Sequence, residues 1–242
     1  MFMRLRQICS ILLVGGLFLF TAAAEAGTMT ADQNQAAPAQ GDTALAAKLV
    51  SGSAAAARTD QIVLVVDHEL SFWQKGTDGQ FSRVFYSYCG YGRSGFTSPA
   101  ERVEGDGSTP IGSYPLTYAF GIASNPGTSM EYRQVTKDSY WSGEPEDYNQ
   151  WTETNTRSMP NSEHLIDYQD AYQYAMVIGY NMNPVTAGKG SGIFLHCKRT
   201  GHWYTAGCVS IPEPLMKELL QKCHAGAWIL IGRNLADIEA LK

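Results

Sequence analysis

The sequence predicts a mainly β fold in a single domain, with a few short helices and one long loop or lid. Thirteen tyrosines, nine phenylalanines, five tryptophans and 24 glycines favour strands and turns over helical bundles. Runs of β-branched and aromatic residues recur between Gly- and Pro-rich turns, which is the pattern of short strands. The 242 residues, 44% of them hydrophobic, suffice for one large core or two small ones.

The first 26 residues are expected to be a signal peptide. Arg4 and Arg6 precede an apolar run over 8–24, and Ala24-Glu25-Ala26 fits the small-x-small pattern of a cleavage site. The run is short for a membrane span, with an uncleaved anchor as the alternative. The sequence therefore predicts an exported protein that works in the periplasm or the cell wall.

Residues 27–58 are expected to form a flexible spacer. They are rich in Ala, Gln, Gly, Thr and Ser and contain no aromatic residue. A weak helix over TALAAKLV (43–50) is the alternative for part of this segment. The folded domain is then expected over 59–242.

The domain begins with three expected strands, over 61–66, 69–75 and 81–88. The first is rich in β-branched residues, and the second alternates between polar and apolar residues. An Asp-Gly turn signal before the third indicates a hairpin. A loop with unusual backbone angles follows at Gly90, Gly92 and Gly95.

The rest of the domain alternates between turn-rich and periodic segments. Residues 103–120 become strand-like after several Gly and Pro residues, whereas 124–159 show little periodicity and indicate the long loop or lid. A short helix capped by Ser162 is expected over 162–172, and an amphipathic helix with early prolines over 211–222. Strands are expected over 174–181, 192–197 and 227–232.

The formal net charge is −5, and no run of basic residues occurs. Because phosphate binding requires clustered Lys and Arg, we do not expect nucleic acid to be a partner. The sequence does not indicate an oligomeric state.

The residues that carry chemistry gather between His196 and Ser210, which hold two of the five histidines and two of the five cysteines. In the expected strand 192–197, side chains alternate between faces. His196 therefore shares a face with Phe194, and Leu195 and Cys197 share the opposite face. One face is expected to be core, and the other can line a cleft.

Cys208 and His196 are the residue types of a thiol nucleophile and its base. A cysteine nucleophile needs a base, close backbone approach and N–H groups directed at the developing oxyanion. Gly207 permits that approach and offers an N–H. Two alternatives remain from these residues alone: a zinc ligand set, and two disulfides, which are the default for four cysteines outside the cytoplasm.

The run from 193 to 212, with a His on a strand and then Thr-x-Gly-Cys-Val-Ser, resembles the catalytic segment of the L,D-transpeptidase family, the YkuD-like domain. Residues 105–114 resemble the upstream segment of that family, in which a Thr-Pro-x-Gly turn leads into a strand. The Gly-rich loop over 90–95 fits as well, so the resemblance covers most of 60–232. It implies a β-sandwich of mixed sheets.

The resemblance also implies a reaction on the stem peptides of peptidoglycan. Cys208 is the expected nucleophile and His196 the general base and acid, with an acyl-thioester, release of D-Ala and transfer to a diamino-acid amine in a 3→3 cross-link. An L,D-carboxypeptidase that uses water, and a non-catalytic wall-binding module, are the alternatives. A carbapenem is expected to acylate Cys208, and no metal or organic cofactor is implied.

The chain departs from the family pattern two residues beyond the cysteine. Many members have Arg or Asn there, and this chain has Ser210. Recognition of a substrate carboxylate must therefore come from elsewhere, with Arg199, Lys198 or a residue of 124–159 as candidates. The residues expected to contact substrate are Thr205, Ser210, Arg199, His202 and Trp203.

Overall fold

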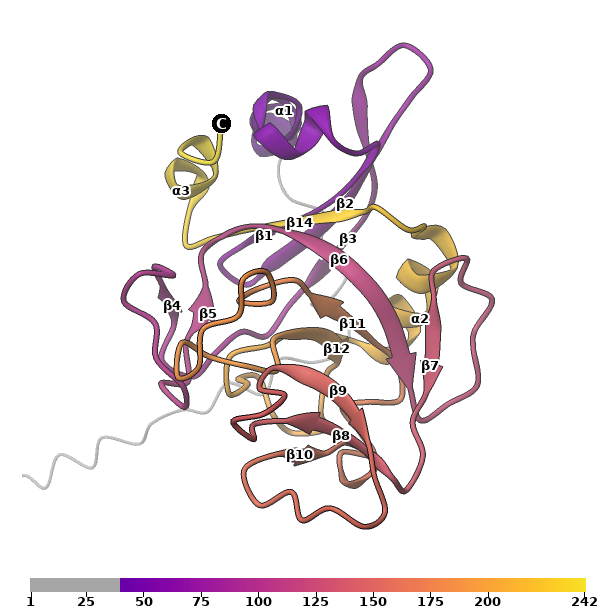
Figure 1. The fold of residues 1–242 in the computed structure, drawn as a ribbon. Helices are drawn as coiled ribbons and strands as arrows, with labels where there is room; N and C mark the ends of the chain where they lie inside the picture. The colour runs from indigo at the N-terminus through magenta and orange to yellow at the C-terminus, as the bar shows by residue number, and fades with distance from the viewer. Residues whose placement is uncertain (1–39) are drawn as a thin grey trace, which may run out of the picture.

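The computed structural model of the chain describes residues 40–242 (Figure 1). The expected signal peptide over 1–26, and the first part of the expected spacer, lie outside these residues. The described chain is mainly β with mixed sheets and a few short helices, as predicted. Within residues 40–242, no helix combines the length and apolar character needed to cross a membrane.

Nine strands form the main sheet, in the order β13-β12-β11-β6-β14-β1-β2-β3, with β7 also paired to β6. A separate pair, β4 (Phe96–Thr97) and β5 (Thr109–Pro110), lies at one end. The strands of the main sheet are β1 (Gln61–Val66), β2 (Glu69–Lys75), β3 (Phe81–Tyr88), β6 (Gly112–Gly121), β7 (Tyr132–Gln134), β11 (Ala175–Ile178), β12 (Phe194–Cys197), β13 (Val209–Ile211) and β14 (Trp228–Gly232).

Strand β6 divides the sheet into two halves. Its first residues pair with β14, and its later residues pair with β11. The largest core cluster contains Val63 of β1 and Leu195 of β12, together with Leu219 of α2 (Glu213–Lys222). The two halves thus share one core, which gives the sandwich that the sequence predicts. Helix α2 matches the expected amphipathic helix and buries its apolar side in this core.

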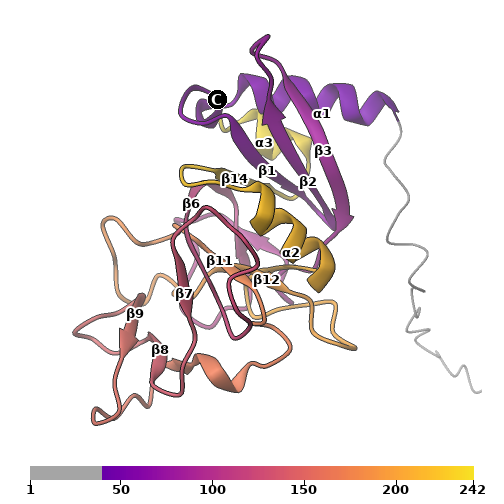
Figure 2. The same cartoon turned by 90° about the vertical axis from the view of Figure 1, so that its right-hand side faces the viewer.

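The outer face of the first half is covered by helices. Ile62 and Leu64 of β1 pack with α1 (Gln40–Gly52) and α3 (Leu235–Glu239), and Figure 2 shows both helices beside this half. Leu49 and Val50 of α1 are buried there, and a 3-10 turn over Ala54–Ala57 follows. Packed structure therefore begins before residue 59, inside the expected spacer, because an apolar strand face needs cover.

The segment expected to be a long loop contains strands. Strands β8 (Ser139–Ser142), β9 (Gln150–Glu153) and β10 (Glu163–His164) form a three-stranded sheet, which we call the lid sheet. It packs on the outer face of the second half, where the rings of Trp141 and Phe194 meet edge to face at 4.8 Å. The expected helix over 162–172 is instead β10 followed by a 3-10 turn, Leu165–Asp167.

Candidate active site

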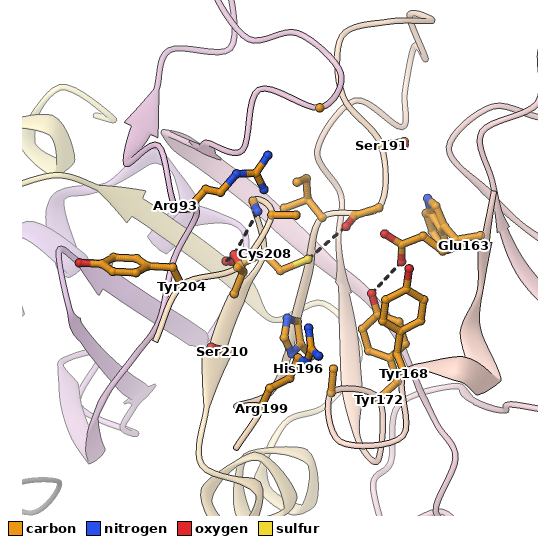
Figure 3. Close-up of a pocket in the computed structure, with 18 of the residues that line it drawn as sticks. Arg93, Glu163, Tyr168, Tyr172, Ser191, His196, Arg199, Tyr204, Cys208 and Ser210 are labelled. Atoms are coloured by element: carbon orange, nitrogen blue, oxygen red, sulfur yellow. Dashed lines mark hydrogen bonds between the residues drawn. The ribbon is translucent and has the colours of Figure 1, made fainter. Parts of the chain in front are cut away.

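A cavity of about 560 Å³ lies between the β12–β13 edge and the lid sheet. Cys208 and His196 both line it, together with Glu163, Tyr172 and Arg102. Figure 3 shows His196 next to Cys208, with Glu163 and Tyr172 on one side of the thiol and Arg93 and Tyr204 on the other.

The register of two parallel strands brings the thiol and the imidazole together. β12 and β13 pair so that His196 lies opposite Ser210 and Leu195 opposite Val209. Cys208, directly before β13, accepts the Phe194 N–H on its Sγ at 3.4 Å. Because side chains alternate along a strand, Cys208 and His196 point to the same side of the sheet. The face assignment predicted from the sequence is confirmed: Leu195 and Cys197 lie in the main core, and Phe194 packs in the cluster that holds Cys208.

Cys208 is a buried, neutral thiol. Its Sγ donates to the Gly192 carbonyl oxygen at 3.2 Å. Burial raises the pKa of Cys208 to about 12, and the Glu163 carboxylate adds to this, while the Phe194 N–H and the Arg102 charge act in the opposite direction. All four cysteines in the described part of the chain are free thiols.

His196 is held in one orientation by the backbone. Its Nδ1 lies 2.8 Å from the Cys197 carbonyl oxygen, an acceptor that requires Nδ1–H. Nε2 is then the basic nitrogen. The pKa of His196 is lowered to about 4, mainly by burial and to a smaller extent by the Arg199 charge, while the hydrogen bond to the Cys197 carbonyl acts in the opposite direction. The acceptor that the sequence left open is thus a main-chain carbonyl, which no residue type could have signalled.

Gly207 differs from its expected role. Its N–H, predicted to face an oxyanion, donates to Thr205 Oγ1 at 3.0 Å. The Thr205 hydroxyl in turn donates to the Cys208 carbonyl at 2.7 Å, so this side chain closes the turn before the thiol. Gly207 has φ +148°, and a Cβ there would lie 2.8 Å from the Ser108 carbonyl oxygen. Glycine is therefore required for close approach and backbone angle.

The upstream segment that resembles the family holds this turn in place. Thr109 Oγ1 donates to the Gly207 carbonyl at 2.8 Å and accepts the Gly92 N–H at 2.8 Å. Three segments that lie far apart in the sequence are thereby tied together beside Cys208. The Gly-rich loop takes part through close packing, because a Cβ on Gly90 would lie 2.1 Å from the Trp203 carbonyl oxygen.

Most of the expected substrate-contacting residues line the cavity: Thr205, Ser210, Arg199 and His202. Trp203 does not, and its ring packs instead under the Lys198 ammonium, 3.0 Å from the ring centre. Trp203 also meets His68 edge to face, so it belongs to an aromatic group outside the cavity. Among the described residues, no group of three or more His, Cys, Asp or Glu side chains is arranged to hold a metal ion.

Sequence reasoning missed a half-buried glutamate next to the thiol. Glu163, on β10 of the lid sheet, accepts the Tyr172 hydroxyl at 2.7 Å, and both line the cavity. Burial raises the pKa of Glu163, and the hydrogen bond from Tyr172 opposes that effect. Its segment was expected to be a helix, so no sequence pattern placed this side chain beside Cys208.

A family model for the L,D-transpeptidase catalytic domain, YkuD, matches residues 60–231. No curated protein matches the chain. Several solved structures match the chain at low identity and with TM-scores below 0.5, among them the following three. The helical cell shape determining protein Pgp2 of Campylobacter jejuni is 18% identical, with a TM-score of 0.40 over 72% of this chain and 48% of that one.

The L,D-transpeptidase of Stackebrandtia nassauensis is 14% identical, with a TM-score of 0.36 over 78% of this chain and 65% of that one. L,D-transpeptidase 1 of Mycobacterium tuberculosis is 13% identical, with a TM-score of 0.33 over 71% and 60%. The chain thus spans about half the length of Pgp2. Because the family match covers more than half of the 242 residues, the chain belongs to the L,D-transpeptidase catalytic domain family.

Proposed function

We propose that the protein is a cysteine-dependent L,D-transpeptidase that acts on peptidoglycan stem peptides. The observation that carries this proposal is the shared cavity of Cys208 and His196, with His196 Nδ1 fixed on the Cys197 carbonyl. A nucleophile, a base and an orienting group are the parts that covalent acyl transfer requires.

The first half of the reaction forms a thioester. Cys208 Sγ attacks the carbonyl carbon of the third stem residue, and the thiol proton passes to His196 Nε2. The carbon–nitrogen bond then breaks, and the His196 proton moves to the departing D-Ala amine. Because the thiol pKa is raised to about 12 and the imidazole pKa is lowered to about 4, the resting pair is neutral. The proton is therefore transferred as the carbonyl is attacked.

The oxyanion is stabilised by backbone donors in this proposal. The Gly207 N–H is engaged by Thr205 Oγ1, so we assign the primary role to the Cys208 N–H. Gly207 contributes by letting the turn before Cys208 pack closely against the Ser108 backbone, since a side chain at that position would collide with it.

The second half transfers the acyl group. The amine of a diamino acid in a second stem attacks the thioester, its proton passes to His196, and the thiol is restored with a 3→3 cross-link formed. If water attacks instead, the same site is an L,D-carboxypeptidase. A wall-binding module without catalysis is less well supported, because Cys208 is a free thiol that lines a cavity with a base.

The proposed substrate lies outside the cytoplasm. We therefore propose that residues 1–26 act as the signal peptide and that the domain works in the periplasm or cell wall. A role in cell shape follows if the cross-links alter the sacculus.

Intact mass spectrometry tests the proposal. The purified protein is expected to gain one carbapenem adduct that is absent from Cys208→Ala. Incubation with a tetrapeptide stem is then expected to release D-Ala and to give a cross-linked dimer when a diamino-acid amine is supplied. A tripeptide as the only product besides D-Ala would assign the carboxypeptidase reaction. If neither the carbapenem nor the tetrapeptide stem forms an adduct with the protein, Cys208 is not the nucleophile.

A further inference from the structure

A buried arginine lines the cavity beside the thiol. Arg102 is 2% exposed, and its Nη1 donates to Asp106 Oδ1 at 3.3 Å and to Ser108 Oγ at 3.2 Å. Its Nε is buried and has no hydrogen-bond partner among the described residues. A buried guanidinium donor without an acceptor is costly, so the charge of Arg102 is not fully satisfied within the fold.

The unpartnered edge lies against bare backbone near the nucleophile. A Cβ on Gly190 would lie 2.7 Å from Arg102 Nε, and a Cβ on Gly207 would lie 3.2 Å from Nη2. Both glycines have positive φ, of +102° and +148°. Gly207 directly precedes Cys208, so Nη2 lies close to the point at which a substrate carbonyl is attacked.

Asp106 fixes the guanidinium and does not saturate it. Its carboxylate also accepts the Ser108 N–H at 2.8 Å, the Ser108 hydroxyl at 2.8 Å and the Val103 N–H at 3.1 Å. The Tyr180 ring, 5.4 Å from Cζ, packs against the guanidinium on the side of Nε and Gly190. Asp106 is therefore a positioning residue that anchors Nη1, whereas Nη2 lies beside Gly207, which lines the cavity.

The other cations at the cavity are less suited to this task. Arg93 and Arg199 line the cavity, but both are exposed, so water screens their charges. Lys198, a candidate from the sequence, is not among the lining residues and lies over Trp203. Arg102 alone in this set is buried, and its attraction for an anion is accordingly stronger.

We propose that Arg102 binds the carboxylate of the residue that departs when Cys208 is acylated, and so selects stems that end at that residue. This inference rests on the proposed function. The departing carboxylate is close along the peptide to the attacked carbonyl, and Arg102 Nη2 lies beside Gly207, the residue directly before Cys208. Arg102 thus supplies the cation that is missing at Ser210.

The test compares two tetrapeptide stems, one with a free terminal carboxylate and one with a terminal amide, by thioester formation on the full chain. The wild type is expected to favour the free acid in kcat/KM by about ten- to a hundredfold, as for loss of a charge-assisted hydrogen bond. Arg102→Gln is expected to bring this ratio close to one. The ratio is internal to each variant, so it does not depend on the fraction of protein that is folded.

Arg102→Lys replaces the glutamine variant in the test if that variant does not fold. Lysine keeps the positive charge that pairs with Asp106 but lacks the paired N–H donors of a guanidinium. Its ratio is expected to fall between the other two. Arg233→Gln is the matched control, since Arg233 pairs with Asp237 at the surface and does not line the cavity. A wild-type ratio near one, or an unchanged ratio in both Arg102 variants, overturns the inference. Absence of a thioester from both peptides in the wild type would refute the proposed function itself, and the inference with it.

Discussion

Strand β12 separates two buried thiols that titrate alike and differ in what surrounds them. Cys197, on the inner face, lies in the core with Leu195, and its Sγ donates to the Tyr174 carbonyl at 3.4 Å. Cys208 lies on the outer side, in the cavity with His196. Burial raises the pKa of Cys197 and of Cys208 to about 12 in each case. Burial therefore does not distinguish the proposed nucleophile from the other thiol, whereas the cavity that Cys208 shares with His196 does.

The sharpest way to break this comparison is to remove each thiol in turn. Cys208→Ala is expected to abolish thioester formation and to leave the fold intact, because the substitution removes a single sulfur atom at the wall of a cavity. Cys197→Ala is expected to keep the reaction and to lower the free energy of unfolding by about 1–3 kcal/mol, as for a core truncation. Activity and denaturant unfolding of both variants measure this. If Cys208→Ala unfolds and both variants lose activity, Cys208 has a structural role.

The second largest effect is expected from the base. His196→Ala should lower the rate of acylation by a factor of about 10²–10⁴ at neutral pH, because the thiol, with its raised pKa, then has no proton acceptor. Single-turnover kinetics with a tetrapeptide stem measure this step directly. A rate within a few-fold of the wild type would exclude His196 as the base.

His196 also makes stability depend on pH. Its pKa falls from 6.5 to about 4 in the folded protein because it is buried, so between these values the unfolded chain binds more protons. Stability from this residue is complete above about pH 6.5 and is lost as the pH falls toward 4, by up to about 3 kcal/mol. His196→Gln removes the titration. The difference in unfolding free energy between wild type and variant should therefore shrink on acidification, and a constant difference would contradict the neutral buried imidazole.

The two sides of β12 also differ in how much of their structure the sequence predicts. Local patterns predicted the alternation over 192–197, the amphipathic helix and the pair Cys208–His196, because these depend on neighbours along the chain. The lid sheet was missed, since its strands are short and depend on pairing between Trp141 and Glu163. Arg102 and the Tyr172–Glu163 pair were missed for the same reason. Their placement beside Cys208 comes from non-local packing, and neither has a spacing that marks it.

The smallest expected effect tests the charges around Cys208, the proposed nucleophile. The Glu163 carboxylate raises the pKa of Cys208 by repulsion, after burial the second cause of that rise. Glu163→Gln should therefore lower the pKa of Cys208 and speed its alkylation several-fold at a fixed, mildly alkaline pH, since the thiolate is the reactive form. Cys197 is the internal control, because Glu163 is not among the groups that shift its pKa. Peptide mapping of alkylated protein reads both thiols in one sample. Equal acceleration at Cys197 and Cys208 would mean that the substitution loosens the fold, whereas acceleration at Cys208 alone would show that the field of the cavity distinguishes two thiols that burial alone leaves equivalent.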